Sequence, residues 1–474
     1  MDETLYIPPK PNSLPAVIAL IRSLWKGDGN LLELLPAEAY HFDIGHLGRS
    51  RRGTVLFNRP SAVKEIMRDE QGVFPKSDLM VGALDPLIGE SMFVTDGPKW
   101  RRQRAMIDPA FSLMRLSVAY VAMCAATDDH VSTISESADS GQPFSLDLAM
   151  SHLTADVICR TVFSTPLASN VAKEVFEDFT LFEKSVAQVD ILGMILKPAW
   201  SEIKQTREVL AACERIRYHI GALIDTHLNV TEGKFNDIAS AVIQAKDKDT
   251  GLPFTRDELI DQLGVFFLAG HETTASALTW VFYILAERPE WLARLREEID
   301  PYMSDGDLSF EATKKLPLTR AFFKEALRLY PPITFVPRVA LEKVEIEGKR
   351  LPRGALVMIA PWTLQRHSKY WEDPHAFKPE RFLPENEKNL TQGAYIPFGQ
   401  GPHLCVGAGF AQVESLLIMS QLVSKFDFEL LPNQRVVPAA RLTTRPAEQV
   451  MMRVRHRAQS NAAPTHLITS RQTV

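Results

Sequence analysis

The sequence has few cysteines, and their spacing does not match that of a redox or zinc centre. Four occur in 474 residues, and no two of them form a C-x-x-C pair. They are Cys124, Cys159, Cys213 and Cys405. Zinc sites, redox dithiols and disulfide frameworks need paired or closely spaced cysteines, so this spacing argues against all three. Scattered cysteines are typical of a reducing compartment, and we expect a cytoplasmic protein.

A long apolar run and a strong net charge are also missing. The longest early apolar stretch, 14–25, is interrupted by Arg22, whereas a helix needs about 20 apolar residues to cross a bilayer. The charged start and the cleavage site of a signal peptide are not found either. The net charge of -5 provides no overall basic field for nucleic acid. We therefore expect no membrane span and no nucleic-acid partner.

The chain does contain the material for one large core. Hydrophobic residues make up 45% of the chain and charged residues 23%, as in ordinary globular proteins. No stretch resembles a linker, a repeat or a low-complexity segment. We expect a single domain over residues 1–456, with an extended lead-in at the proline-rich "YIPPKPNSLP" and a polar, disordered tail over 457–474.

Helical periodicity dominates the long segments. It runs through "LAMSHLTADVICRTVF" and "REVLAACERIRYHIGALIDTHL". One helix has a distinct start, because Thr255 and Glu258 match the capping box and Phe254 and Leu259 are placed as its hydrophobic staple. We expect this helix to run to Arg288, where the following proline ends it.

A smaller β region follows the two prolines after Tyr330. The segment "VPRVALEKVEIEGKRLPRGALVMIA" alternates β-branched and polar residues, which predicts short antiparallel strands and turns. The predicted fold is therefore mainly α with a smaller β region.

The stretch "FGQGPHLCVG", 398–407, concentrates glycine around a single cysteine. Its glycines permit positive φ and a close approach of the backbone to a bulky ligand. An apolar run of helical spacing follows Cys405, so the thiol lies at a helix N-terminus, where a thiolate is favoured. Three interpretations are open: a nucleophile with His403 as its base, a metal ligand, or a buried structural cysteine.

The spacing within this stretch resembles the haem-binding loop of the cytochrome P-450 superfamily, F-G-x-G-x-[RH]-x-C-x-G. Six restricted positions arise by chance on the order of once in 100,000 such sequences at background usage. They are filled by Phe398, Gly399, Gly401, His403, Cys405 and Gly407. The resemblance implies the P-450 fold and haem b (iron protoporphyrin IX), with Cys405 as the axial iron ligand. It also implies that Phe398, Gly399 and Gly407 contribute to cofactor binding.

A second segment, "AGHETT", lies within the capped helix and resembles the family motif [AG]-G-x-[DE]-T. Small residues at Ala269 and Gly270 leave room beside the helix for a flat cofactor, and a mid-helix threonine hydroxyl competes for backbone carbonyls. The resemblance assigns proton delivery to Glu272 and Thr273. The alternative is an exposed polar turn. A zinc protease is not indicated, since the second histidine of H-E-x-x-H is missing.

Two further segments match the family in order and separation. In "KEALRLYPP", Glu325 and Arg328 fit E-x-x-R, and "FKPERF" supplies Arg381. An i,i+3 ion pair alone is usually a solvated surface feature. The resemblance implies instead a buried structural triad that supports the cysteine loop.

The remaining segment, "WRRQR", resembles the family pattern W-x-x-x-R. Its spacing places Trp100 and Arg104 on one helix face, where an arginine can pair with a haem propionate. His403 and Arg338 are the other expected propionate partners.

The resemblance implies a monooxygenase that uses dioxygen to hydroxylate or epoxidise a small molecule. No G-x-G-x-x-G fingerprint and no clustered iron–sulfur cysteines occur, so a separate ferredoxin and ferredoxin reductase are implied as electron donors. A basic patch of Lys99, Arg101 and Arg102 is a hypothetical docking point for an acidic partner, and a solvated face is its alternative.

Alternative functions and the substrate stay open. A peroxide-using peroxygenase or a haem-thiolate isomerase generally lacks the acid–alcohol pair, and a haem sensor needs an output module that is not seen. Candidate substrate contacts are apolar, which fits a fatty acid, a terpenoid or a steroid-like molecule, although plain core packing explains them equally. They are Val265, Phe266, Ala269, Ile333, Phe335, Val336 and an expected loop from Leu79 to Phe93.

Overall fold

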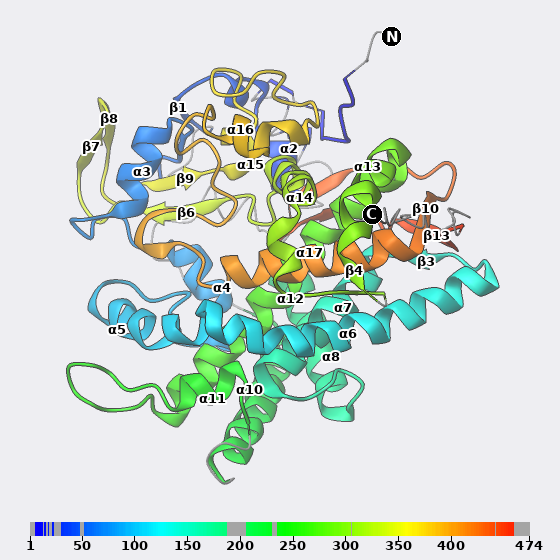
Figure 1. Cartoon of the computed structure of the whole chain (residues 1–474). Helices are drawn as coiled ribbons and strands as arrows, with labels where there is room; N and C mark the ends of the chain where they lie inside the picture. The colour runs from blue at the N-terminus through cyan, green and yellow to red at the C-terminus, as the bar shows by residue number, and fades with distance from the viewer. Residues whose placement is uncertain are drawn as a thin grey trace, which may run out of the picture.

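The computed structural model describes residues 5–12, 14–15, 18, 21–22, 30–47, 52–186, 205–229, 235–304, 306–440 and 442–458. Over these ranges the protein is mainly α-helical with a smaller β region, as the sequence predicts (Figure 1). Residues 5–12 form neither helix nor strand, in agreement with the extended lead-in. Most of the expected tail, 459–474, lies outside the described residues, as does much of 14–25.

The helices account for most of the described chain. The longer ones are α6 (Leu113–Ser140), α7 (Leu146–Phe163), α8 (Asn170–Val186), α10 (Arg207–Leu228), α12 (Arg256–Glu287), α14 (Pro317–Leu329) and α17 (Ala408–Lys425). The shorter ones are α2 (Leu31–Leu34), α3 (Pro60–Arg68), α4 (Asp78–Ile88), α5 (Gly97–Ile107), α11 (Ile238–Ile243), α13 (Pro289–Ile299), α15 (Pro361–Leu364) and α16 (Pro384–Glu387).

Helix α12 lies at the centre of the molecule, where α7, α10, α14 and α17 pack against it. Its predicted capping box is confirmed: the Glu258 amide donates to the Thr255 hydroxyl at 3.2 Å, and the Thr255 amide donates to the Glu258 carboxylate at 2.8 Å. The helix ends at Glu287, and Pro289 begins α13. Almost every side chain from 259 to 285 is buried, so the helix is fixed by packing on all sides.

The strands form one four-stranded sheet and several small ribbons. The sheet has the order β1 (Ile44–His46), β2 (Val55–Phe57), β9 (Leu356–Ile359), β6 (Val336–Val339). A three-stranded sheet orders β10 (Phe426–Leu430), β13 (Met451–His456) and β3 (Phe144–Ser145). Two-stranded ribbons join β7 (Val344–Ile346) to β8 (Lys349–Leu351), β11 (Pro438–Ala440) to β12 (Thr444–Pro446), and β4 (Met303–Ser304) to β5 (Asp307–Leu308).

The predicted antiparallel strands after Tyr330 are confirmed by the β6–β9 and β7–β8 pairs. Strands β1 and β2 were not predicted, and β2 pairs with β9 in parallel.

The expected loop from Leu79 to Phe93 is wrong, because most of it is helix α4. The Ser77 hydroxyl caps this helix by accepting a hydrogen bond from the Leu79 amide at 3.2 Å. Gly82 and Pro86 read as breakers in the sequence, but burial of Leu84, Leu87 and Ile88 outweighs them.

Among the described residues, no single helix has the length and apolar character to cross a membrane. One pair of consecutive helical segments, Gly97–Phe111 and Leu113–Ser140, has the required length and apolar character only when the two are taken together, and it is bent by 58°. All four cysteines are free, so the prediction of no disulfide framework is confirmed.

Candidate functional site

The cysteine loop is a tight turn that ends at α17. Gly399 and Gly401 have φ of +74° and +71°, which side-chain-bearing residues rarely adopt. A Cβ on Gly401 would also lie 3.1 Å from the Met67 carbonyl oxygen. The Cys405 amide donates to the Phe398 carbonyl at 3.0 Å, which closes the turn. The sequence therefore needs glycine here for backbone reasons.

Cys405 lies two residues before Gly407, the N-cap of α17. The residue is exposed to solvent, yet it lies deep enough in the protein that burial raises the pKa of its thiol. The Gly407 amide and the Arg104 guanidinium act in the opposite direction and stabilise the thiolate. Cys405 is thus accessible from solvent although it lies deep in the protein, and nearby donors favour its thiolate. These are the properties of a metal ligand.

The middle of α12 interrupts an otherwise buried helix. Between 259 and 285 only Ala269, Gly270 and Thr273 are partly exposed. The Thr273 hydroxyl donates to the Ala269 carbonyl at 2.6 Å, the competition for backbone carbonyls that the sequence predicts. A partly exposed strip of small residues on a central helix fits a flat group lying beside it.

Gly270 has a packing role that the sequence did not indicate. A Cβ at this position would lie 2.4 Å from Cδ1 of Ile158 on α7. The glycine thus allows α7 and α12 to approach closely.

A basic cluster, formed by Lys76, Arg104, Arg338 and His403, lies around the Trp100 side chain. Lys76 and Arg338 face each other across an antiparallel β-bridge. Arg338 is 5% exposed, and its one hydrogen bond in the described structure goes to the Pro337 carbonyl at 3.3 Å. Burial lowers its pKa. Lys76 is also buried, and its ammonium lies 3.5 Å from Asp96.

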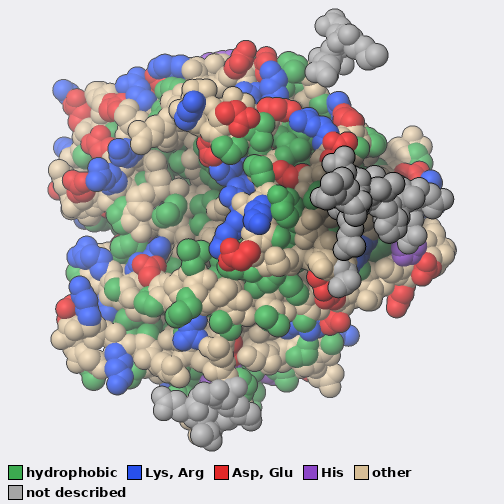
Figure 2. All heavy atoms as spheres, in the orientation of Figure 1, with side chains coloured by type: hydrophobic (Ala, Val, Ile, Leu, Met, Phe, Trp, Pro, Cys, Tyr) green, Lys and Arg blue, Asp and Glu red, His purple; other side chains and the backbone are tan. Residues whose placement is uncertain are grey.

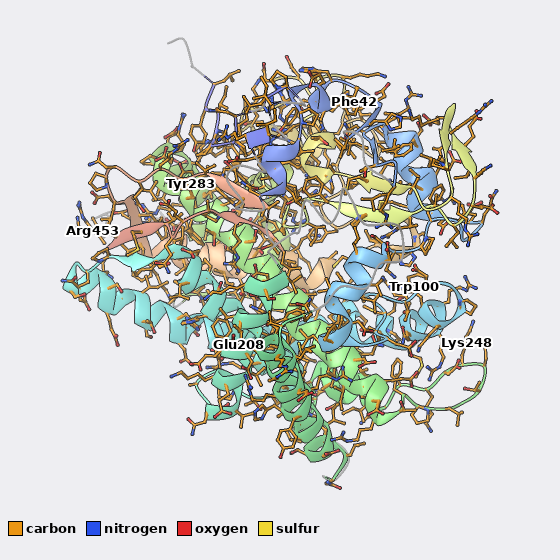
Figure 3. All side chains as sticks on the ribbon, turned by 180° about the vertical axis from the view of Figure 1, so that it is seen from behind. Phe42, Trp100, Glu208, Lys248, Tyr283 and Arg453 are labelled. Carbon is orange, nitrogen blue, oxygen red and sulfur yellow. The ribbon has the colours of Figure 1, made fainter. Side chains whose placement is uncertain are left out.

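The Trp100 indole comes from α5 (Figure 3) and lies against the His403 imidazole, with 4.0 Å between ring centroids. Burial lowers the pKa of His403, and the nearby charges of Lys76 and Arg338 act in the same direction, which brings it to about 3, so this imidazole is neutral at pH 7. The Arg104 guanidinium donates to the Leu404 carbonyl at 2.6 Å and pairs with Asp108.

The haem that the resemblance implies fits these residues. A buried cation without a carboxylate partner is costly, and the basic cluster holds more positive charge than Asp96 offsets. Haem carries two propionates, which would supply the missing anions. Lys76 was not identified from the sequence, because a lone lysine in "FPKSD" carries no motif.

The predicted structural triad comes together in the structure. Glu325 and Arg328 are fully buried and form two hydrogen bonds of 2.7 and 2.8 Å. The Arg381 guanidinium lies 3.5 Å from Glu325. Arg328 also donates to the Gln365 carbonyl at 2.8 Å, and the Gln365 side chain accepts from the Ile396 amide at 2.8 Å. The ion pair is thus connected to the segment that leads into the cysteine loop.

Glu272 and Thr273 are neighbours in the chain, but no hydrogen bond joins their side chains in the described structure. The Glu272 carboxylate instead accepts two N–H groups of Arg445, the Nε–H at 2.8 Å, and the Thr443 hydroxyl at 2.7 Å. Burial raises the pKa of Glu272, but Arg445, His271 and the Thr443 hydroxyl together hold it below its ordinary value. Sequence reasoning missed both partners, since "LTTRP" lies far along the chain and matches no motif.

The candidate substrate residues differ in burial. Val265 and Phe266 are buried on α12, where the Phe266 ring meets Phe111 edge-on at 5.2 Å. Ile333 and Phe335 are partly exposed just before β6. Core packing explains the first two, while the second two have free surface for contact with a ligand.

The expected basic patch is largely neutralised by the protein itself. Lys99 pairs with Glu90, and Arg102 lies 2.6 Å from Glu258, so of the three cations only Arg101 shows no acidic partner among the described residues. On the face that carries α5 and α17, Figure 2 shows basic and acidic side chains interspersed. These ion pairs reduce the net positive charge of the three cations, and the docking patch stays a prediction.

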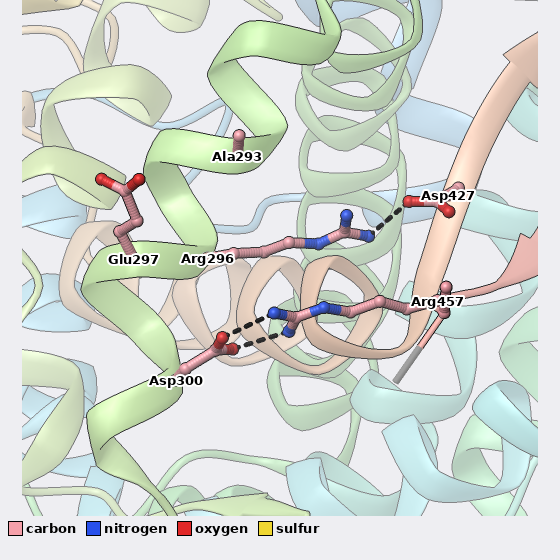
Figure 4. Close-up of a pocket in the computed structure, with 7 residues that line it drawn as sticks. Ala293, Arg296, Glu297, Asp300, Asp427 and Arg457 are labelled. Carbon is pink, nitrogen blue, oxygen red and sulfur yellow. Dashed lines mark hydrogen bonds and ion pairs between the residues drawn. The ribbon is translucent and has the colours of Figure 1, made fainter. Parts of the chain in front are cut away.

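A surface pocket between α13 and β10 contains none of the predicted site residues (Figure 4). Its charged groups pair internally: Arg296 with Asp427 at 2.8 Å, and Arg457 with Asp300 at 2.7 Å. Both arginines are thereby neutralised, so this pocket has no strong preference for an ion.

Comparison with known proteins covers almost the whole chain. The family model described as Cytochrome P450 matches residues 8–453. Cyclooctat-9-en-7-ol 5-monooxygenase of Streptomyces melanosporofaciens is 30% identical over 432 residues, which cover 89% of each chain. Cyclooctatin synthase of the same organism is 28% identical, covering 87% of this chain and 88% of the relative. The crystal structure of a cytochrome P450 haem domain has a TM-score of 0.76 at 23% identity, covering 88% of this chain and 89% of the solved one, which supports the fold alone.

Proposed function

Because the chain belongs to the cytochrome P450 family and is a haem-thiolate monooxygenase, we propose that it hydroxylates or epoxidises a terpenoid-like molecule at haem b. We take residues 1–456 as a single catalytic domain. The observation that carries the proposal is Cys405, which is exposed to solvent although it lies deep in the protein. Two further features support it: the partly exposed strip of small residues on α12, and the basic cluster, whose positive charge the nearby carboxylates do not fully balance.

We assign the cofactor contacts to residues from five parts of the chain. Cys405 would supply the thiolate ligand to the haem iron, and the loop glycines allow the backbone to pass close to it. Lys76, Arg338 and His403 hold the propionates, with Trp100 beside them. The haem supplies activation of dioxygen when it is bound. Ala269 would leave space next to it without a polar side chain, whereas the missing side chain of Gly270 makes room for Ile158 of α7.

Thr273 and Glu272 are assigned to proton delivery. The Thr273 hydroxyl donates its hydrogen to the Ala269 carbonyl, so the lone pairs of its oxygen can accept a hydrogen bond on the exposed side. Keeping both an alcohol and an acid favours a dioxygen-using enzyme over a peroxygenase or an isomerase.

The proposed substrate is lipophilic because the candidate contacts are apolar. Ile333, Phe335 and Val336 are partly exposed between α14 and the sheet, and Leu79 and Met80 of α4 are partly exposed as well. A relative named for oxidation of a cyclic alkenol favours a terpenoid over a fatty acid. A separate ferredoxin and its reductase supply the electrons.

A spectral titration tests the proposal. A cyclic terpenoid alcohol and a fatty acid of matched carbon number are added to the purified ferric protein, and the Soret band is followed. We expect the alcohol to shift the band as water leaves the iron, with saturable binding. A shift produced by the fatty acid alone would contradict the terpenoid assignment.

A further inference from the structure

A buried charged network surrounds the acid of α12. It consists of Glu183 on α8, His271 and Glu272 on α12, and Arg445 on β12. The carboxylate and imidazole atoms of the first three lie within 4.8 Å of one another. Arg445 already supplies the positive charge next to Glu272, so these residues do not form a cation site.

The hydrogen bonds of His271 locate one proton. Its Nδ1 lies 2.8 Å from the Phe267 carbonyl, which is an acceptor only, so Nδ1 carries a hydrogen. Its Nε2 lies 3.2 Å from the Glu183 carboxylate. Two facing lone pairs would repel at this distance, which favours a further proton on one of the two groups.

The surroundings make this proton hard to lose. The rings of Phe176, Phe179 and Phe267 contact the His271 imidazole. With the shared proton present, Glu183 and Glu272 are balanced by His271 and Arg445. Removing it leaves an uncompensated negative charge in an apolar environment, which favours prompt reprotonation.

The network also has a side open to solvent. The Glu183 side chain is 14% exposed, whereas that of His271 is 2% exposed. A proton can therefore enter at Glu183, and the polar atoms of Glu183, His271 and Glu272 lie within 4.8 Å of one another for its transfer to Glu272, the residue before Thr273.

We propose that Glu183 and His271 form a proton-holding pair that resupplies Glu272 during turnover. Both are positioning residues, since they act through Glu272. The proposal rests on the proposed function for its purpose and on geometry for the pair itself. One proton moves from solvent to the pair and one from the pair to Glu272, so no further reactant is needed.

The test compares holoenzyme carrying Glu183→Gln with Glu174→Gln. Glu174 makes a matched control, because it lies on the same helix and pairs with His219 at 3.4 Å outside the network. Electrons come from a surrogate ferredoxin and reductase, and peroxide is counted per electron. We expect the peroxide share to rise about threefold or more in Glu183→Gln, with a larger solvent isotope effect, and no change in Glu174→Gln. An unchanged share and isotope effect in Glu183→Gln would overturn the proposal.

A second readout does not depend on turnover. Selectively labelled histidine is followed by NMR against pH, and His271→Asn identifies the His271 signal. Burial lowers the pKa of His271, but Glu183, Glu272 and the Phe267 carbonyl together raise it above its ordinary value of 6.5, with Glu183 contributing most. We therefore expect the pKa of His271 to lie above 6.5 in the unaltered protein and to fall in Glu183→Gln. If Glu183→Gln fails to fold, a His271 pKa below 6.5 in the unaltered protein would overturn the pair by itself. Absence of the thiolate-type carbon monoxide spectrum in the unaltered protein would instead contradict the proposed function and leave this titration interpretable.

Discussion

Lys76 and Arg338 face each other across a β-bridge, although they come from opposite halves of the chain. Bridge partners project their side chains to the same side, so two cations share one buried space beside Trp100. This arrangement is unfavourable in the protein alone and becomes favourable once anions are bound.

Arg338→Met should therefore have opposite effects on two forms of the protein. In the haem-free form, replacing a buried, poorly paired cation should raise the free energy of unfolding by about 1–4 kcal/mol. In the haem-loaded form, loss of a propionate partner should speed transfer of haem to an apo-acceptor protein. Thermal unfolding and transfer kinetics measure the two effects. Destabilisation of the haem-free form would contradict the assigned role.

Glu325→Ala should be severely destabilising. It leaves the fully buried Arg328 without its carboxylate, at a cost of about 3–5 kcal/mol in the free energy of unfolding. Glu311→Ala is the control, because its pair with Lys314 is exposed and should contribute about 0.2–1 kcal/mol. Urea unfolding checks both values, and similar losses in the two variants would show that the buried pair has no special role.

Glu414 of α17 should make stability depend on pH. Burial raises the pKa of this carboxyl well above its ordinary value of 4.5, and the Thr274 side chain offsets only part of this rise. The folded protein therefore keeps a proton that the unfolded chain loses above pH 4.5. The free energy of unfolding should fall by about 1.4 kcal/mol per pH unit from this group as pH rises through the region between the two pKa values.

Glu414→Gln removes this proton exchange, so its unfolding free energy should fall less steeply between pH 5 and 8. Urea unfolding across that range provides the comparison, with Glu311→Gln as the exposed control. Parallel pH profiles for the unaltered protein and Glu414→Gln would show that Glu414 is ionised in the folded state.

Thr273→Ala should divert electrons from product to peroxide, because it removes the hydroxyl that lies on the partly exposed strip of α12. Thr273→Ser keeps the hydroxyl and should retain most of the coupling. The ratio of peroxide to electrons consumed is the measurement. Equal ratios in the two variants would show that the Thr273 hydroxyl has no role in proton delivery.

The parts of the fold that depend on local signals were predictable from the sequence. The capping box at Thr255 and the proline after Arg288 defined α12 within one residue. Strand β2 escaped prediction because it is three residues long and pairs with β9, which lies about 300 residues away. Helix α4 was mistaken for a loop, since Gly82 and Pro86 weigh against a helix locally while its burial depends on tertiary packing.

In the site, too, local sequence signals could be predicted and long-range contacts could not. Motifs predicted Cys405 and the Glu325–Arg328 pair, because each lies in a short stretch of restricted spacing. The partners Lys76 and Arg445 reach the site through long-range chain topology, and an isolated lysine or arginine carries no such signal. The motif gave Gly270 a place beside the cofactor, which stays a prediction, whereas its contact with Ile158 could only be seen once α7 and α12 were packed together.

The most direct test of the central claim is the absorption spectrum of the reduced carbon monoxide complex of Cys405→Ala beside the unaltered protein. We predict that the unaltered protein shows the red-shifted Soret band of a thiolate-ligated haem and that the variant does not. Retention of that band in Cys405→Ala would contradict the assignment of Cys405 as the axial ligand.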